Sequence, residues 1–520
     1  MTTTSKNDTS GTTGAADGRR WAVLAICSVA SALLGIDTSV LNYAVPSLSA
    51  QLAPSATQLL WIVDVYGFVL GGMLIVMGNL GDRIGRKKLL LLGVTGFGAA
   101  SALTAYAGSP ETLIAARALL GLAGATIMPS TLSLVRAVFT DPKERTTAVG
   151  ISGGVAAASF ALGPVVGGLL LDHFWWGSVF LVNVPVMALV LAAGAVILPE
   201  SRNPHPGRLD WTSVPLSVLG MFGVIYAIKT AARDGVSEPS VWIAAGLGAA
   251  LLGAFVHRQT TLAEPLLDLR LFRNSAFSGA ISANVVTMFA STVLSLGFSL
   301  YFQEVRGWSP LTAGLAVLPG PLAAAAAAPA ASMLIPLIGR ARTVAAGLVL
   351  MGLSTVGLGF ATEHTAYWQL LPVVVVNGAG LMLTFAVTAD TILASAPATR
   401  TGAAAATSET AMELGGALGI AILGSVLSAY YRSGLTLPAG LTAQQTGAAR
   451  ESVSGGVATG AQLPGGLGHQ VAEAARHAFT DSLHTTTLIG GALMLAGAVA
   501  ALITLRKVPA VLVDPAPATV

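Results

Sequence analysis

The sequence predicts an all-α protein that crosses a membrane many times, and three observations lead to this fold class. Only 10% of the 520 residues are charged, against about 25% in a soluble domain, and the mean hydropathy is +0.74. Apolar runs of about 20 or more residues, long enough to cross a bilayer as a helix, recur along the chain. The period-two alternation of a membrane barrel is missing.

Fourteen apolar segments are predicted to be membrane-spanning helices. In chain order they cover residues 21–46, 57–78, 89–107, 111–135, 146–171, 178–198, 212–230, 240–257, 276–303, 311–336, 341–362, 367–393, 402–431 and 484–505. We expect a six-helix bundle over 21–198, a two-helix insert (spans 7 and 8) over 199–275, and a second six-helix bundle over 276–506.

The distribution of basic residues predicts the orientation in the membrane. If the N-terminus is cytoplasmic, the cytoplasmic segments contain 20 of the 27 Lys and Arg residues and the external segments contain 6, while Arg117 lies inside a span. Basic residues accumulate on the cytoplasmic side, so we expect a multi-pass protein of the cell membrane with both termini in the cytoplasm. Residues 1–20 and 507–520 read as cytoplasmic tails, and no cleavable signal peptide is apparent.

Residues 432–483 form a long polar segment between the last two spans. A mobile external loop is the preferred interpretation, and a lid over an exit path is the alternative. A weak internal repeat also appears, because Gly85-Arg86 after span 2 aligns with Gly339-Arg340 after span 10. Internal repeats are common in transporters, although the second copy lacks an acid at the position of Asp82.

Four carboxylates interrupt the apolar spans: Asp37, Asp64, Glu409 and Glu413. A carboxylate at bilayer depth costs about 2.5–3.5 kcal/mol, so such residues usually face a bundle interior or a wet cavity and handle protons, ions or cationic ligands. Counted along their helices, Asp37, Asp64 and Arg117 lie at a similar depth. A buried Arg needs a carboxylate partner. A proton-coupling site is therefore predicted here, with a purely structural ion-pair network as the alternative.

Glu409 and Glu413 are four residues apart and share one helix face. Two carboxylates this close in a low dielectric do not both ionise readily, which suits a site that exchanges protons for a cation. For Glu409 the alternative is a partly wet helix end, because it lies about seven residues from the predicted inner boundary of its span.

The loop after span 2 has the most specific pattern in the chain, running from Gly78 to Lys88. Its glycines allow two helices and a tight turn to approach closely. Asp82 can lie at a helix N-terminus and pair with a neighbouring Arg, which would hold the cytoplasmic side closed. A basic loop that only sets topology explains the lysines but not this order of residues. We therefore predict a cytoplasmic gate motif made of Gly78, Gly81, Asp82, Arg83, Gly85 and Arg86.

This loop resembles the cytoplasmic signature of the major facilitator superfamily. Other stretches resemble its fourteen-helix drug:proton antiporters, the group that includes quaternary-ammonium and multidrug exporters. These stretches are Leu33–Pro46 in span 1, Trp61–Tyr66 in span 2, Arg117–Ala125 in span 4, Gly163–Gly168 in span 5 and Glu409–Gly415 in span 13. The resemblance covers essentially the whole chain.

The resemblance implies a fold and a set of roles. The fold is the major facilitator fold of two six-helix bundles, here with two extra central helices. Proton coupling falls to Asp37, Arg117 and Glu413, and substrate binding to Asp64, Glu409 and Glu413. Gly163, Pro164, Gly167 and Gly168 match the antiporter motif. One departure is that no Asp or Glu lies between Glu304 and Glu363, whereas some multidrug relatives carry an acid in span 10, which puts recognition of divalent cations in doubt.

We expect a proton-coupled multidrug exporter of lipophilic, cationic toxic compounds that works by alternating access. Its partners would be a small-molecule substrate, protons and membrane lipid, with the chain acting as a monomer. No enzymatic, ATP-hydrolysing, nucleic-acid-binding, cofactor or metal-ligand pattern is apparent. The first alternative is an exporter dedicated to one antibiotic or secondary metabolite, which the Ala/Gly-rich composition suggests. The second is a non-transporting membrane receptor or scaffold, against which the intramembrane charges argue.

Overall fold

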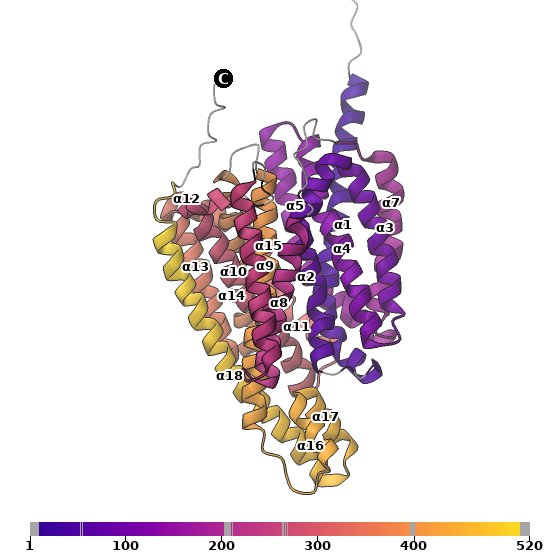
Figure 1. Cartoon of the computed structure of the whole chain (residues 1–520), viewed down its shortest axis with the longest axis vertical. Coiled ribbons are helices and arrows are strands. Elements are labelled where there is room, and N and C mark those ends of the chain that lie inside the picture. Colours follow the sequence, from indigo (N-terminus) through magenta and orange to yellow (C-terminus); the bar gives the residue numbers. More distant parts are fainter. Residues whose placement is uncertain are drawn as a thin grey trace, which may run out of the picture.

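A computed structural model describes residues 10–395 and 401–509, apart from 53, 55, 202–209, 211, 263, 264, 266 and 268. Every regular element in the described part of the chain is a helix. The helices stand side by side in two groups with a helical pair between them (Figure 1). The N-terminal end of α1 and the C-terminal end of α18 lie at the same end of the molecule. We call this the terminal end.

The first group holds the helices before residue 200. They are α1 (Ser10–Leu52), α2 (Ala56–Ile84), α3 (Arg86–Ala105), α4 (Pro110–Val138), α5 (Pro142–His173), α6 (Ser178–Leu181) and α7 (Asn183–Ile197). Their apolar faces form one continuous core. Local signals agree with the boundaries, since Ser109 caps α4 through a reciprocal pair of hydrogen bonds with Thr112, and Pro110 occupies the first helical position.

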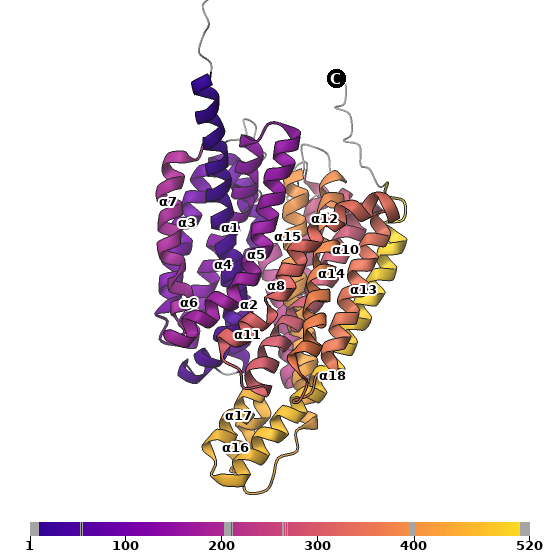
Figure 2. The same ribbon diagram turned by 180° about the vertical axis from the view of Figure 1, so that it is seen from behind.

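The second group begins after residue 268. It contains η1 (Leu269–Arg273), α10 (Ser275–Leu300), the π-helical turn η2 (Tyr301–Val305), α11 (Pro310–Val317), α12 (Pro319–Ile338), α13 (Arg340–Gly359), α14 (Tyr367–Ala394), α15 (Thr401–Gly434) and α18 (Gly465–Thr504). Figure 2, seen from behind, shows the same separation of the two groups, with α5 and α11 where they meet.

The pair between the groups consists of α8 (Ser213–Asp234) and α9 (Pro239–Thr261). The base of this pair is fastened by an ion pair in which Nε of Arg258 lies 2.6 Å from Oδ2 of Asp210. The hydrogen bonds from Arg258 hold the pKa of Asp210 well below its usual range. An aromatic cluster joins α8 to α2, with Trp61 stacked on Phe222 at 5.2 Å between ring centroids.

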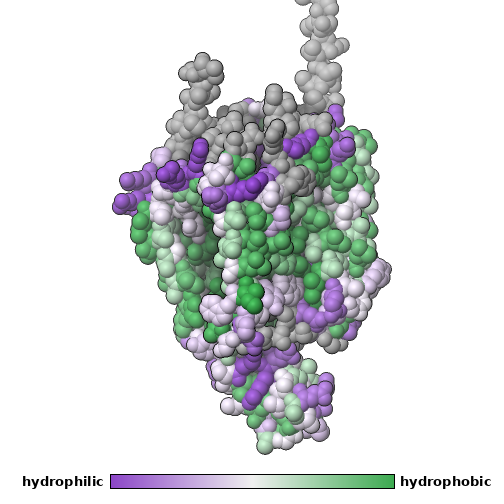
Figure 3. Space-filling view, in the orientation of Figure 1, coloured by the Kyte–Doolittle hydropathy of each residue, from purple (hydrophilic) through white to green (hydrophobic). Residues whose placement is uncertain are grey.

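Each of the fourteen predicted spans coincides with a helix or with two consecutive helices. Among the described residues, eleven helices are long and apolar enough to cross a membrane, and two shorter apolar helical stretches lie at Trp61–Leu74 and Ser213–Ile228. The all-helical, multi-pass prediction is thus confirmed, and the number fourteen stays a prediction. The space-filling view agrees, because apolar side chains cover the middle of the face shown and hydrophilic ones gather towards the terminal end (Figure 3).

The weak internal repeat marks two turns with the same backbone conformation. Gly85 joins α2 to α3 with φ 105° and ψ 135°, and Gly339 joins α12 to α13 with φ 82° and ψ 162°. A positive φ favours glycine because it has no Cβ. The two motifs therefore make equivalent helix-to-helix turns, one in each group.

Residues 432–483 differ from the predicted mobile loop, because most of them are helical. They contain α16 (Ala443–Glu451), α17 (Val453–Gln462) and the start of α18. We call residues 443–479 the cap; it lies at the end opposite the termini (Figure 1). Its apolar side chains pack on the second group, with Val471, Ala475 and Phe479 in the same core as Phe302 and Tyr431. Burial against the bundle explains the order that composition alone did not predict.

Candidate functional site

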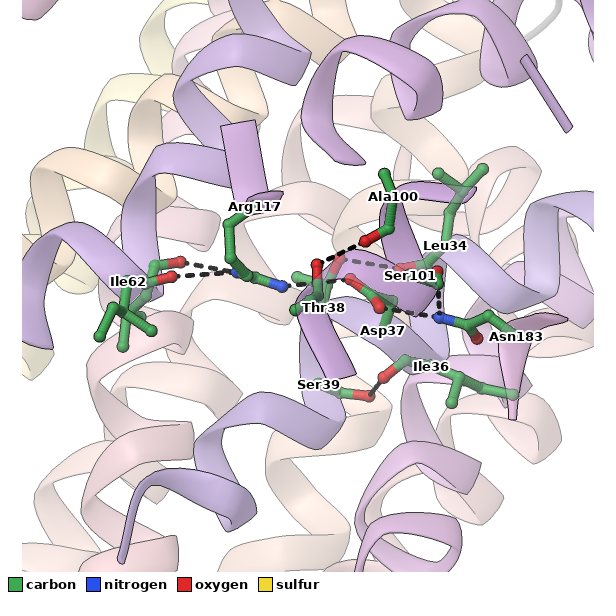
Figure 4. Close-up of polar contacts among 12 residues, drawn as sticks. Leu34, Ile36, Asp37, Thr38, Ser39, Ile62, Ala100, Ser101, Arg117 and Asn183 are labelled. Carbon is green, nitrogen blue, oxygen red and sulfur yellow. Dashed lines mark hydrogen bonds and ion pairs between the residues drawn. The ribbon is translucent and has the colours of Figure 1, made fainter. Parts of the chain in front are cut away.

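The predicted pair Asp37 and Arg117 is buried inside the first group. Arg117 on α4 places Nη1 3.2 Å from Oδ2 of Asp37 on α1. The exposed fraction is 1% for the Arg117 side chain and 0% for that of Asp37. Figure 4 shows Asp37 between Arg117 on one side and Asn183 on the other. The depth count from the sequence thus brought together two residues that are in direct contact.

Arg117 is held by α2 as well as by Asp37. Its Nε donates to the carbonyl of Ile62 at 3.0 Å, and its Nη2 donates to the carbonyl of Val63 at 3.4 Å. The guanidinium also lies over the ring of Tyr66, 5.0 Å from the centroid, within the range of cation–π attraction. Arg117 therefore ties the Asp37 carboxylate to the stretch of α2 that immediately precedes Asp64.

Two polar residues that the sequence reading missed complete this site. Asn183, at the start of α7, donates from Nδ2 to Oδ1 of Asp37 at 3.0 Å and to Oγ of Ser101 at 3.2 Å. Both residues are completely buried. An asparagine inside an apolar span was the available signal, because an amide at bilayer depth needs partners as a carboxylate does. Asp37 thus has an ionic partner on one oxygen and a neutral donor on the other.

Glu413 reaches from the second group to α2. A Cβ built on Gly67 would lie 3.0 Å from Oε2 of Glu413, and one built on Gly71 would lie 3.0 Å from its Cβ. One helical turn before Glu413 on α15, Oγ1 of Thr410 donates to the carbonyl of Gly71 at 3.1 Å. The two glycines lie one and two helical turns along α2 from the buried Asp64, and they make room for the Glu413 side chain.

Glu409 and Glu413 are both half-buried on α15, one turn apart as predicted. Glu409 follows Ser408, whose hydroxyl accepts a hydrogen bond from Nδ2 of Asn284 at 3.2 Å. The four acids therefore lie in three places. Asp37 is inside the first group, while Asp64 and the Glu413 carboxylate lie along α2 where the two groups meet and Glu409 lies one turn nearer the terminal end of α15.

The predicted gate motif lies at the turn between α2 and α3, at the terminal end. Gly85 approaches Glu200 so closely that a Cβ there would overlap its carboxylate, and N–H of Arg86 donates to the carbonyl of Ser201 at 2.9 Å. Gly81 faces Leu89 across the turn, since a Cβ would lie 3.1 Å from Cδ2 of that residue. The side chain of Asp82 lies outside the described residues, so its predicted latch stays a prediction.

The antiporter motif on α5 lies where the groups meet. A Cβ on Gly163 would overlap Ser39 and one on Gly167 would overlap Val40, both on α1. A Cβ on Gly168 would overlap the backbone of Leu311 on α11, and Gly314 approaches the carbonyl of Pro164 equally closely. Small residues let backbones approach. Here they bring α5 against α1 on one side and against the second group on the other.

Within the described residues, no three His, Cys, Asp or Glu side chains are grouped in a way that could hold a metal ion. Buried carboxylates in membrane-spanning helices are groups that can take up protons or pair with cations. A helical membrane protein with such a site between two groups of helices has the features of a membrane transporter.

Comparisons with known proteins identify the class. The sequence profile of the Major Facilitator Superfamily matches residues 27–283 and 280–443. The chain is 42% identical over 489 residues to the multidrug efflux pump LfrA of Mycolicibacterium smegmatis, covering 94% of this chain and 97% of that protein. It is 36% identical to the methyl viologen resistance protein SmvA of Salmonella typhimurium, covering 84% and 88%.

A solved structure supports the fold. A bacterial homologue of the human lysosomal transporter Spinster, in an inward-facing and unoccupied conformation, superposes with a TM-score of 0.63 at 17% identity, covering 94% of this chain and 98% of that one. The chain therefore belongs to the major facilitator superfamily, as its motifs indicated. It is a multi-pass membrane transporter rather than an enzyme, and its similarity to efflux pumps supports an efflux transporter.

Proposed function

We propose that the protein exports lipophilic cations from the cell in exchange for protons, with both termini in the cytoplasm. One observation carries the proposal. The carbonyls of Ile62 and Val63 on α2 hold the guanidinium that pairs with Asp37, and the next two turns of α2 carry Asp64 and make room for Glu413. Asp37, which we take as the proton-binding group, and the acids Asp64 and Glu413 are thus grouped around one segment of α2. The names of LfrA and SmvA, which describe drug efflux and resistance, support the same conclusion.

The exchange follows from charge balance. When Asp37 takes up a proton, it loses its attraction for Arg117, whose other anchors are backbone carbonyls of α2. The buried positive charge then lacks a counter-ion, which is costly, and it favours a rearrangement that brings Arg117 nearer to another carboxylate. Asp64 lies on α2, and the Glu413 side chain of α15 packs against Gly67 and Gly71 of the same α2 helix. A cation bound there would be displaced when Arg117 and protons neutralise those acids, so proton and substrate compete.

Alternating access requires the two groups to separate at one end while they touch at the other. Contacts between the groups support this division. Oγ of Ser299 on α10 donates to the carbonyl of Asn42 on α1 at 3.4 Å, and Tyr43 packs in the apolar core of the second group. Both contacts lie towards the end that carries the cap. We propose that these contacts, together with the α5–α11 contact at Gly168, open when substrate is released outside.

Charge should also set selectivity. Once Arg117 is matched to Asp37, the acids Asp64, Glu409 and Glu413 leave an excess of negative charge, which a lipophilic cation neutralises and an anion does not. Helix α12 contains no acid. We therefore expect monovalent cations to be exported better than divalent ones.

The test uses purified protein in proteoliposomes with an imposed proton gradient. Ethidium efflux should require the gradient and should release protons into the lumen in return. Glu413→Gln should lose transport of a bis-quaternary ammonium compound by at least about fivefold, equivalent to roughly 1 kcal/mol of lost charge pairing, and should keep more of its activity towards the mono-quaternary analogue.

Two results would contradict the proposal. Efflux that proceeds equally without a proton gradient would exclude proton coupling. Equal transport of the two quaternary compounds, unchanged in Glu413→Gln, would show that the carboxylates do not set selectivity. That second result favours the alternative, an exporter dedicated to one antibiotic or secondary metabolite.

A further inference from the structure

A chain of buried polar side chains crosses the second group of helices, apart from the Asp37 site. At its centre is Asn284 on α10, which is 2% exposed. Its Oδ1 accepts a hydrogen bond of 2.6 Å from Oγ1 of Thr388 on α14, and its Nδ2 donates to Oγ of Ser408 on α15 at 3.2 Å. Three helices are therefore linked by one amide at a place where apolar packing would serve stability at least as well.

The chain continues to the terminal end of the molecule. One turn after Thr388 on α14, the hydroxyl of Thr391 accepts a hydrogen bond from Nη1 of Arg340 at 3.1 Å. Nη2 of the same Arg340 lies 2.5 Å from Oδ2 of Asp390, whose side chain is 59% exposed while that of Arg340 is 4% exposed. The buried polar groups thus extend to within one helical turn of an ion pair that is accessible at the surface.

The chain also continues inward, towards the acids. Ser408 directly precedes Glu409 on α15. On α10, Thr287 lies one turn further from the terminal end than Asn284. Thr287 is completely buried, and its hydroxyl has no hydrogen-bond partner among the described residues. A buried hydroxyl without a partner costs free energy, and such groups are commonly satisfied by ordered water or a ligand. Thr287 is therefore a group on α10 that an ordered water would satisfy.

Helices α10 and α15 pack closely beside this chain of polar side chains. Gly415 and Gly419 on α15 lie against the backbone of α10, so that a Cβ on Gly415 would be 2.7 Å from the carbonyl oxygen of Val285 and one on Gly419 would overlap Phe289. The polar groups therefore lie in a tightly packed seam in which individual hydroxyls and amides set the route.

We propose that the residues Asn284, Thr287, Thr388 and Ser408 form a proton path between Glu409 and the terminal end of the protein, leaving at Arg340 and Asp390. This inference rests on the proposed proton coupling and adds the route by which one bundle exchanges its proton. Ordered water molecules held by the hydroxyls of Thr287, Thr388 and Ser408 carry the proton: each water accepts one proton and passes another to the next, so that a proton leaving Glu409 is replaced from the terminal end. Asn284 is a positioning residue that orients both hydroxyls. The charged or titratable groups along the route are Glu409 and Glu413 at its deep end and Asp390 and Arg340 at the terminal end.

Thr388 offers a matched pair of variants for the test. Thr388→Val keeps the shape of the side chain and removes the hydroxyl, whereas Thr388→Ser keeps the hydroxyl. In proteoliposomes with ethidium, we expect Thr388→Val to slow proton-gradient-driven efflux at least about tenfold, the rate equivalent of one lost buried hydrogen bond. Ethidium–ethidium exchange, which moves no net proton, should stay at the wild-type rate. Thr388→Ser should restore driven efflux, and the solvent deuterium isotope effect should rise in Thr388→Val.

The outcomes separate this inference from the proposed function. Wild-type protein without gradient-driven efflux would overturn both. Normal wild-type coupling together with unchanged driven efflux and isotope effect in Thr388→Val would overturn the path and leave the proposed function intact. Equal slowing of driven efflux and of exchange would also overturn the path, because it indicates a packing defect. If Thr388→Val does not fold, Ser408→Ala with Ser408→Thr as its control gives the same comparison.

Discussion

Replacing Asp37 by Asn removes the charge opposite a completely buried guanidinium. Breaking a buried ion pair by removing one partner typically costs about 3–5 kcal/mol. Here Arg117 keeps the carbonyls of Ile62 and Val63 and the face of Tyr66, so we expect the lower end of that range, about 3 kcal/mol. Asn183 can still hydrogen-bond to the new amide oxygen, which preserves the local geometry.

A double-mutant cycle separates the structural cost from the functional one. Arg117→Met alone leaves Asp37 buried and unpaired and should destabilise the protein by a similar amount. The double variant, with Asp37→Asn and Arg117→Met, removes both charges and should regain most of the stability, to within about 1 kcal/mol of wild type. Stability is measured by reversible unfolding in mixed micelles. Glu238→Gln, an exposed acid at the start of α9, is the control and should change nothing.

Transport should follow a different pattern from stability. Drug-driven proton release from energised vesicles should be absent in Asp37→Asn, and it should remain absent in the double variant despite its recovered stability. If Asp37→Asn releases protons at the wild-type rate, Asp37 is not part of the coupling site. If the double variant is as unstable as the sum of the two single variants, the two side chains do not act as a pair.

Two further changes test the motifs at the turns and at the interface. Asp82→Asn should lower the turnover rate several-fold with little change in ethidium affinity, because the residue is expected to bias the conformational equilibrium rather than contact substrate; a large loss of affinity at normal turnover would argue against this. Gly168→Ala should impair transport and cost about 1–3 kcal/mol of stability, since its Cβ would overlap the backbone of Leu311. Gly154→Ala, on the same helix with nothing within 4 Å of its Cβ, is the control, and equal behaviour of the two variants would refute the close α5–α11 contact.

The helices and most residues of the candidate site could be located from the sequence. Apolar length determines which segments form spanning helices, because the bilayer leaves no other way to satisfy the backbone. Charged residues are rare within membrane spans because they are costly in lipid, so Asp37, Arg117 and the two acids of α15 could each be recognised in the sequence. Counting residues along helices even placed Asp37 and Arg117 at one depth, because a straight helix rises by a constant amount per residue.

The order of residues 443–479 was not predictable in the same way. The segment is rich in Gly, Ala and Gln, which local composition associates with loops. Its helices are stabilised by contacts with distant residues, such as Tyr431, whose hydroxyl donates to the carbonyls of Ala449 and Ser452. Ser454 donates to the carboxylate of Glu304 in η2, and Arg476 donates to the carbonyl of the same residue. The contacts with Glu304 join residues 150 and 172 positions apart, and a single sequence does not reveal such pairs.

The sequence by itself determined that the chain spans the membrane, where its intramembrane charges lie along each helix, and to which superfamily its motifs belong. Only the tertiary structure decided which groups face one another: Asn183 on Asp37, Glu413 against Gly67 and Gly71, and Asn284 between Thr388 and Ser408. The physical reason is that depth along a helix is fixed by its constant rise, whereas the rotation and neighbours of each helix depend on packing with all the others.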